Sequence, residues 1–250
     1  MTQERNAPLT ARSVLASALL GEDPPELPVS QLVHLAGLFG INGNRARVAL
    51  SRMAASGEVT TDGSGRYRLA GHLLERQGRQ RASRAGRTGS WTGSWYLAVV
   101  TTSGSPAEHR TARRAALRFA RLGELREGVW LRPDNIELRV DPAVGRDLAV
   151  FAGRPDGDPG ALAAGLWDLE GWAGRAEALL ERLAAAPTRG PGDLAPGFVL
   201  SASVLRHLQA DPLLPVELLP PAWPGDRLRT RYDAWDTDYR RVLAAWSRRT

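Results

Sequence analysis

Apolar residues recur at helical spacing in three successive runs near the start of the chain. The first run covers residues 12–20 and follows Thr10, a residue type that often caps a helix N-terminus. The second covers residues 29–40, and the third begins after Asn42, another favourable cap, and stops at Gly57. The pattern therefore predicts three short helices in close succession.

Two strand-like segments follow the third run. Residues 59–61 and 66–69 flank residues 62–65, whose sequence Asp-Gly-Ser-Gly is typical of a hairpin turn. A hairpin directly after three helices is what distinguishes a winged helix from a plain helix-turn-helix. We therefore predict an N-terminal winged helix-turn-helix domain over residues 1–86, followed by a boundary near residues 88–94, which are rich in Gly and Ser.

The middle of the chain has the pattern strand, helix, strand, strand. Residues 95–100 form the continuous apolar run of a central strand, and residues 107–121 have helical periodicity. Further strands are expected at residues 129–131 and 148–151. Because this order is typical of a ferredoxin-like fold, we predict a ferredoxin-like dimerisation domain over residues 90–160.

The remainder of the chain, residues 161–250, is mostly helical in pattern. Helices are expected at residues 166–186, 198–209 and 227–247. The predicted fold class is therefore α+β, with a helical C-terminal domain that we assign to effector binding or regulation.

The third predicted helix has two chemically different faces. Ala46, Leu50 and Met53 form the side expected to be buried. The opposite side is short, polar and cationic, which suits insertion into a DNA major groove, where arginine bonds guanine or phosphate and asparagine pairs with adenine. The residues predicted to contact DNA from this helix and its cap are Asn42, Asn44, Arg45, Arg47, Val48, Ser51 and Arg52.

The second strand of the wing adds two further basic positions. Arg66 and Arg68 alternate with Tyr67, so both arginines share one face of the strand. A wing of this kind rests on the phosphate backbone or reaches the minor groove. We therefore add Arg66 and Arg68 to the predicted DNA-binding residues.

Charge supports a polyanionic partner and narrows the possible chemistry. The net charge is +6, and all 33 basic residues are arginine, so lysine-dependent phosphate loops and Schiff bases are excluded. The absence of cysteine excludes disulfides, thiolate zinc sites and thiol nucleophiles. The four histidines have no metal-ligand spacing, so we expect no catalytic residue, no metal and no cofactor.

No apolar run of the sequence is long enough to span a membrane, and the start of the chain lacks the pattern of a secretion signal. We therefore expect a cytoplasmic protein without a membrane partner.

Three segments resemble a known family. Residues 37–59, in which the third helix contains Ala49-Leu50-Ser51-Arg52, resemble the recognition segment of PaaX-like repressors of phenylacetic acid degradation. Residues 126–133 resemble the middle-domain signature of that family, and residues 211–235 resemble its C-terminal signature. The three segments occur in the expected order. One departure is Glu58, where the family often has an aromatic or bulky residue.

The resemblance implies a homodimeric transcriptional repressor of aromatic catabolism, which binds double-stranded operator DNA and releases it when a small metabolite such as an aryl acyl-CoA binds. Trp130 and Arg132 are candidate effector-binding residues, because alternate strand positions share a face and an indole beside a guanidinium suits an aromatic acyl group with an anionic neighbour. The alternative is that Trp130 belongs to the core and Arg132 to an ion pair.

Two other functions remain open at this point. Winged helices also bind proteins, so an interaction module is one alternative, and an enzyme acting on acyl-CoA or nucleic acid is another. The middle domain also resembles the small nuclease of CRISPR adaptation, which uses an aspartate at the end of its first strand. Thr101 and Thr102 stand there in this chain, so the enzyme alternative lacks its catalytic carboxylate.

Overall fold

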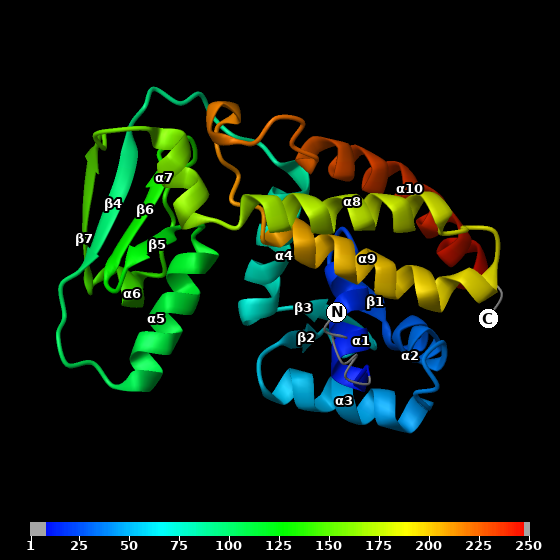
Figure 1. Ribbon diagram of the computed structural model, residues 1–250. Helices are drawn as coiled ribbons and strands as arrows, with labels where there is room; N and C mark the ends of the chain where they lie inside the picture. The colour runs from blue at the N-terminus through cyan, green and yellow to red at the C-terminus, as the bar shows by residue number, and fades with distance from the viewer. Residues whose placement is uncertain (1–8, 248–250) are drawn as a thin grey trace. The chain divides into compact units, whose positions relative to one another are not determined.

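The computed structural model describes residues 9–247 and divides into two compact units (Figure 1). The first unit joins the chain up to Ala85 to Leu179–Gln209 and to the C-terminal segment from Arg227. The second contains Gly86–Ala178 and Ala210–Asp226. The fold is mixed α+β with two antiparallel sheets and a helical C-terminal region, as predicted. The boundaries of the three predicted domains stay a prediction.

The N-terminal part of the first unit contains helices and a three-stranded sheet. Strand β3 lies between β1 and β2 and pairs antiparallel with both. This order and pairing are consistent with the predicted winged helix-turn-helix. The elements are α1 (Ala11–Leu20), β1 (Glu26–Pro28), α2 (Val29–Gly37), α3 (Gly43–Ala55), β2 (Val59–Thr61), β3 (Arg66–Leu69) and α4 (Gly71–Ala85).

One apolar core holds these elements together. The Oγ1 atom of Thr10 accepts a hydrogen bond from the Ser13 N–H at 3.1 Å, so the predicted cap starts α1 at the expected place. Each helix then contributes its apolar stripe to the core, as the helical periodicity requires. Fully buried members are Leu15, Leu19, Leu32, Leu50, Met53, Leu69 and Leu73.

The C-terminal helices of the first unit pack against the N-terminal part. Leu243 and Trp246 of α10 contact the core described above, and the Trp246 ring stacks on His34 with centroids 3.6 Å apart. Phe198 of α9 packs against Phe39 at 5.1 Å between centroids. The Tyr239 hydroxyl of α10 donates to the carbonyl of Leu194 in α9 at 2.9 Å. The helices of this region are α8 (Leu169–Ala185), which belongs to this unit from Leu179 onward, the 3-10 turn Pro191–Asp193, α9 (Leu194–Gln209) and α10 (Gly225–Ser247), which belongs to it from Arg227 onward.

The second unit is built on a four-stranded antiparallel sheet of order β5-β6-β4-β7. Strands β4 and β5 are joined by helix α5, and β6 lies between them, which is the ferredoxin-like order predicted from the sequence. The elements are β4 (Trp95–Val100), α5 (Ala107–Phe119), β5 (Gly123–Arg126), β6 (Val129–Pro133), α6 (Pro142–Gly145), β7 (Leu148–Gly153), α7 (Pro159–Leu166) and the 3-10 turn Val216–Leu218.

Two apolar clusters form on this sheet, because successive strand residues point to opposite faces. Leu117 of α5 packs with Ala98 and Trp130. Ala163 of α7 packs with Trp95 and Leu131, which belong to the other face. The sheet is therefore covered on both faces within this unit.

A glycine permits the close approach of α7. A Cβ atom at Gly123 would lie 2.7 Å from the Cβ of Leu166, so any larger residue at this position of β5 would displace the helix.

Candidate nucleic-acid interface

The helix predicted to read DNA, α3, starts and ends at the signals seen in the sequence. The Oδ1 atom of Asn42 accepts a hydrogen bond from the Arg45 N–H at 2.9 Å. Gly57, two residues after the last helical residue, has a φ of +73°, a conformation that glycine adopts without strain. Between these signals Ala46, Leu50 and Met53 are buried, with exposures of at most 1%. Packing therefore fixes which side of α3 faces solvent.

The opposite side of α3 is exposed along its length. Its residues are polar or cationic except for Val48, whose exposure is 44%, and Ala55 in the last turn. The helix thus presents to solvent the residues expected to read DNA, and their role in binding stays a prediction. These exposed residues are Asn44, Arg45, Arg47, Val48, Ser51 and Arg52, preceded by the exposed cap Asn42.

The arginines of this face keep their charge uncompensated. Within residues 9–247, Arg45, Arg47 and Arg52 form no ion pair. A Cβ atom added at Gly43 would lie 3.0 Å from Nη1 of Arg47, so the Arg47 guanidinium lies over the first turn of the helix. Free guanidinium groups at a helix surface are the groups that bind phosphate or a guanine edge.

The wing has a different charge balance. Arg66 and Arg68 are both exposed on one side of β3, as predicted, while Leu69 is buried. Both bind Glu26 of β1: the Arg66 Nη2 atom lies 3.1 Å from Oε1, and the Arg68 Nε atom donates to Oε2 at 2.8 Å. These bonds lower the pKa of Glu26, and the hydrogen bond from Arg68 is the larger cause. The two wing arginines therefore carry one compensating carboxylate between them.

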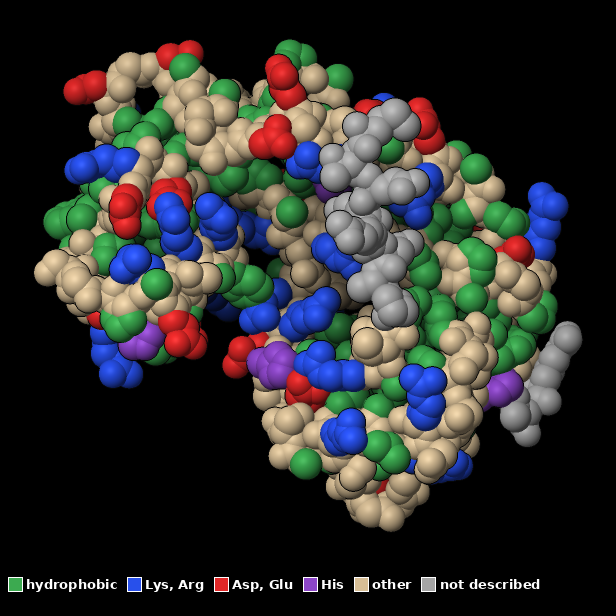
Figure 2. Space-filling view, turned by 60° about the horizontal axis from the view of Figure 1, so that its bottom comes forward, with side chains coloured by type: hydrophobic (Ala, Val, Ile, Leu, Met, Phe, Trp, Pro, Cys, Tyr) green, Lys and Arg blue, Asp and Glu red, His purple; other side chains and the backbone are tan. Residues whose placement is uncertain are grey.

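Other arginines of the basic segment are also paired. Arg81 lies 2.8 Å from Asp23, and Arg84 contacts Asp233 and Asp236 of α10. Within residues 45–87, the arginines of β3 and of the end of α4 are therefore paired with carboxylates, whereas those of α3 are not. Figure 2 turns this part of the first unit toward the viewer, and its surface shows blue side chains set among tan and green ones.

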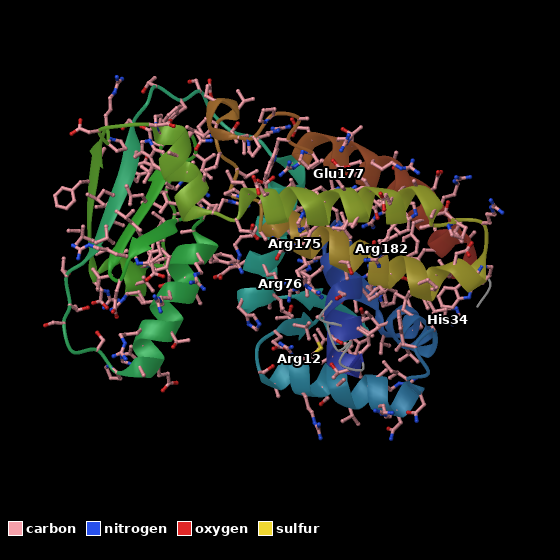
Figure 3. All side chains as sticks on the ribbon, in the orientation of Figure 1. Arg12, His34, Arg76, Arg175, Glu177 and Arg182 are labelled. Carbon is pink, nitrogen blue, oxygen red and sulfur yellow. The ribbon has the colours of Figure 1, made fainter. Side chains whose placement is uncertain are left out.

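Glu58, directly after α3, takes part in the fold. Arg12 of α1, which is labelled in Figure 3, donates to both carboxylate oxygens. The His72 Nε2 atom lies 3.8 Å from Oε1 of the same carboxylate. The hydrogen bond from Arg12 lowers the pKa of the Glu58 carboxyl, against the opposing effect of desolvation. This acidic residue thus joins α1 to the end of the reading helix.

Comparisons with known proteins agree with this geometry. A family model described as "PaaX-like protein" matches residues 10–73, the segment from the α1 cap to the start of α4. The solved structure of the uncharacterized protein Rv0674 from Mycobacterium tuberculosis is 42% identical, with a TM-score of 0.75 over 95% of this chain and 98% of that one. The chain belongs to the PaaX-like family. A search of curated proteins gave no match.

Membership in the PaaX-like family makes this chain a member of a family of transcription regulators. The matched segment contains every predicted DNA-binding residue, from Asn42 to Arg68. It also contains Glu26, which sequence reasoning missed. The only sequence signal for Glu26 was its acidic charge within the proline-rich segment before α2.

The two predicted effector-binding residues of the PaaX-like protein lie inside the second unit. Trp130 and Arg132 have exposures of 1% and 0%. The Arg132 Nη2 atom donates to Oδ1 of Asn135 at 3.1 Å and its Nε to the carbonyl of Pro133 at 2.9 Å, while Nη1 has no hydrogen-bond partner among residues 9–247. Burial lowers the pKa of Arg132 to about 9. Effector binding by Trp130 and Arg132 stays a prediction.

The described part of the chain has no candidate metal site and no candidate membrane-spanning helix. Within residues 9–247, no group of three or more His, Asp or Glu side chains is arranged to hold a metal ion. No helix in the same range is long and apolar enough to cross a membrane.

Proposed function

We propose that this PaaX-like protein is a transcriptional repressor that binds double-stranded operator DNA through the exposed side of α3. The observation that carries the proposal is the pairing of a buried stripe with a solvent face whose three arginines, Arg45, Arg47 and Arg52, are free of carboxylates within the described chain. Family membership supports the regulatory role.

The positions on α3 suggest that some residues contact bases and others contact phosphates. Asn44, Arg47 and Ser51 recur at spacings of three and four, so they share one line of the helix surface and are placed to meet base edges. Arg45 and Arg52 flank that line and suit phosphate contacts. The wing arginines, held by Glu26, would bind the backbone with part of their charge already compensated.

We propose that the protein acts as a homodimer, since a symmetric operator requires two reading helices about 34 Å apart or a multiple of that distance. The second unit offers a surface for pairing. β7 is an edge strand without a charged residue, and Val150 and Phe151 are 47% and 57% exposed. A second copy pairing there would continue the sheet. Sedimentation of the full chain should show a dimer, and Phe151→Glu should shift it toward monomer.

We further propose that the protein is not an enzyme and that a metabolite, such as an aromatic acyl-CoA or a related aromatic anion, releases it from DNA. A tenfold loss of DNA affinity needs about 1.4 kcal/mol of coupling between the two sites. Linkage then requires operator DNA to weaken metabolite binding by the same factor.

The decisive experiment is selection of bound duplexes from a random-sequence pool, followed by fluorescence anisotropy with selected and random DNA. Arg47→Ala should cost about 1–3 kcal/mol on selected DNA and much less on random DNA. Arg182→Ala, a change at an exposed position of α8, is the control and should change neither the affinity for selected DNA nor the affinity for random DNA. If no sequence is enriched, α3 does not read DNA, and a protein-binding role for this face becomes the better explanation.

A further inference from the structure

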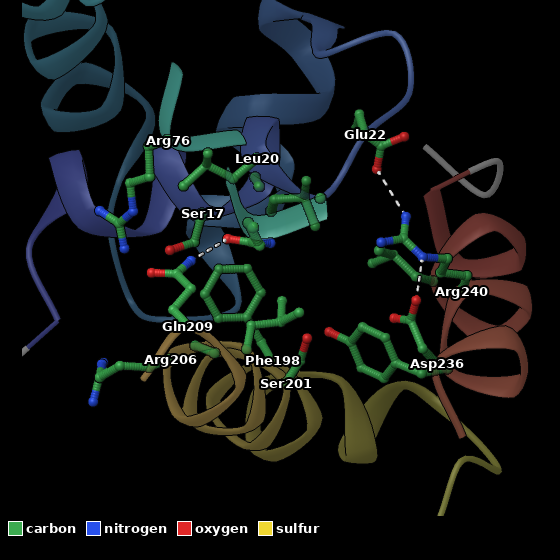
Figure 4. Close-up of a pocket in the computed structure, with 18 residues that line it drawn as sticks. Ser17, Leu20, Glu22, Arg76, Phe198, Ser201, Arg206, Gln209, Asp236 and Arg240 are labelled. Atoms are coloured by element: carbon green, nitrogen blue, oxygen red, sulfur yellow. Dashed lines mark hydrogen bonds and ion pairs between the residues drawn. The ribbon is translucent and has the colours of Figure 1, made fainter. Parts of the chain in front are cut away.

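The first unit contains a cavity of about 110 Å³ bounded by α1 and α4 on one side and by α9 and α10 on the other (Figure 4). We propose that this cavity is the effector site and that its ligand is a compact organic carboxylate with an apolar body of about one ring. The effector role rests on the proposed repressor function, whereas the ligand site itself does not.

Apolar side chains line the middle of the cavity. Leu20, Leu35, Phe198, Leu205 and Leu243 come from four different helices. The volume of the cavity is close to that of an engineered cavity of about 150 Å³ that binds benzene in another protein. It is well below the roughly 300 Å³ at which pockets for drug-sized ligands begin. The volume therefore admits one ring or a short branched chain and leaves no room inside for a nucleotide, so of the two effectors proposed above it favours the aromatic anion over the acyl-CoA.

The charges at the two ends of the cavity are unequal. Arg76 and Arg206 lie at the end marked by Gln209 in Figure 4, where Gln209 donates to Gln80 at 3.3 Å. Both arginines are exposed, and neither forms an ion pair with any residue in the described part of the chain. An anion can therefore gain two guanidinium partners here without breaking an existing pair.

The opposite end is already neutralised. Arg240 lies 2.9 Å from Asp236 and 3.8 Å from Glu22, and Asp236 also binds Arg84 at 2.9 Å. The carboxylates that line the cavity are thus held by arginines, so they offer no free site for a cation. The geometry selects a ligand with its negative charge toward Arg76 and Arg206 and its apolar part toward Phe198.

The walls of the cavity connect it to the reading helix. α1 packs on α3 through the shared core, and α4 begins two residues after the end of wing strand β3. The remaining walls, α9 and α10, lie outside the segment that contains the DNA-reading residues. A carboxylate that binds better to a placement of α4 against α9 that disfavours DNA lowers DNA affinity by at most the ratio of its own affinities for the two placements.

The test uses the full chain and calorimetric titration with benzoate and cyclohexanecarboxylate to about 10 mM, one decade above the millimolar range. Benzamide, which has the same ring without the charge, is the ligand control. At least one carboxylate should bind saturably, and benzamide should bind at least about tenfold more weakly. Failure of both carboxylates to saturate would overturn the site.

Variants then locate the binding. Arg76→Gln and Arg206→Gln should each weaken the carboxylate by about tenfold, whereas Arg182→Gln on α8, outside the cavity lining, should leave it unchanged. Ala202→Leu fills the cavity while keeping both arginines, so it should also abolish binding at an unchanged melting temperature. Equal affinities in Arg76→Gln, Arg206→Gln and Arg182→Gln would overturn the assignment.

Anisotropy with the selected duplex separates the two proposals. A saturating carboxylate should lower DNA affinity in the wild type and not in Ala202→Leu. Carboxylate binding that depends on Arg76 and Arg206 but leaves DNA affinity unchanged would overturn the effector role. Absence of specific DNA binding would overturn the proposed function, while the calorimetry would still decide the site.

Discussion

Replacing Glu26 by Gln should strengthen DNA binding, because this carboxylate holds both wing arginines. Glu26 lies opposite Arg68 in the β1–β3 register and is bonded to Arg66 as well. The side chains of Arg66 and Arg68 are 45% and 62% exposed, so they need no rearrangement of the core to turn toward a phosphate. Glu26→Gln removes one negative charge and keeps a side chain of the same shape.

The size of the effect follows from counterion release. Each additional phosphate contact changes the slope of log K against log salt by about −0.9 for duplex DNA. Three free arginines on α3 would give a slope of about −3 per chain in the wild type, and one released charge on the wing would steepen it by about one. Between 50 and 200 mM salt, the advantage of Glu26→Gln should therefore shrink by roughly 3.5-fold.

The assay is fluorescence anisotropy with random duplex DNA at four or more salt concentrations, because the wing is expected to contact the backbone. Asp23→Asn is a matched control, since it removes one charge from the same segment but releases Arg81 of α4. An unchanged slope in Glu26→Gln would refute the reasoning, and so would the same change in Asp23→Asn, because that result would reflect net charge alone. Urea unfolding should show only a small stability change, because both arginines of the lost cross-strand pair are exposed to solvent.

Two further predictions concern stability, both measured by urea unfolding. Glu58→Gln should cost about 1 kcal/mol of unfolding free energy near neutral pH, since the partner Arg12 is half exposed. The fold lowers the pKa of Glu58, so the carboxylate stabilises the protein at pH values above the usual pKa of a glutamate. This stabilisation is lost as the pH falls through the lowered pKa, so the difference between Glu58→Gln and wild type should shrink in acid. Gly197→Ala should cost about 1–3 kcal/mol, because a Cβ there would lie 2.5 Å from Cε2 of Tyr239, whereas Gly174→Ala in α8, with open space at its Cβ, should stabilise by roughly 0.5–1 kcal/mol. A gain for Gly197→Ala, or acid-independent loss for Glu58→Gln, would contradict the packing and charge arguments.

Long periodic segments could be predicted from the sequence, whereas short elements could not. The three N-terminal helices and the wing strands lie where their periodicity and caps placed them. β1 has three residues and ends in Pro28, so it shows no alternation. β5 has four residues and an irregularity between Glu124 and Arg126, and α7 has only eight residues, two of them glycines. These elements form because neighbouring strands and helices cover them.

The reading face of α3 could be predicted for the same reason, since one helix with one buried stripe decides which side chains point outward. The wing could not be predicted fully. Its arginines lie on the expected face, but their partner Glu26 is 40 residues away from Arg66 in sequence, on a strand without a signal. The cavity could not be predicted from the sequence either, because two of its lining residues, Ser17 and Arg240, come from opposite ends of the chain.

The number of arginines in a segment therefore does not show which of them can bind DNA. The positions of the carboxylates that pair with them must also be known. Arg84 illustrates the point: it belongs to the same basic segment as Arg47, but it is bound to Asp233 and Asp236 of α10, where it joins α4 to the C-terminal helices. Lysine could make such contacts only as a point charge, whereas guanidinium also forms geometrically fixed pairs. In this chain the same residue type thus stabilises the first unit at one end of the segment and stays free for DNA at the other. Pairing distinguishes the arginines of α3, which form no ion pair within residues 9–247, from those of β3 and the end of α4, which are bound to carboxylates.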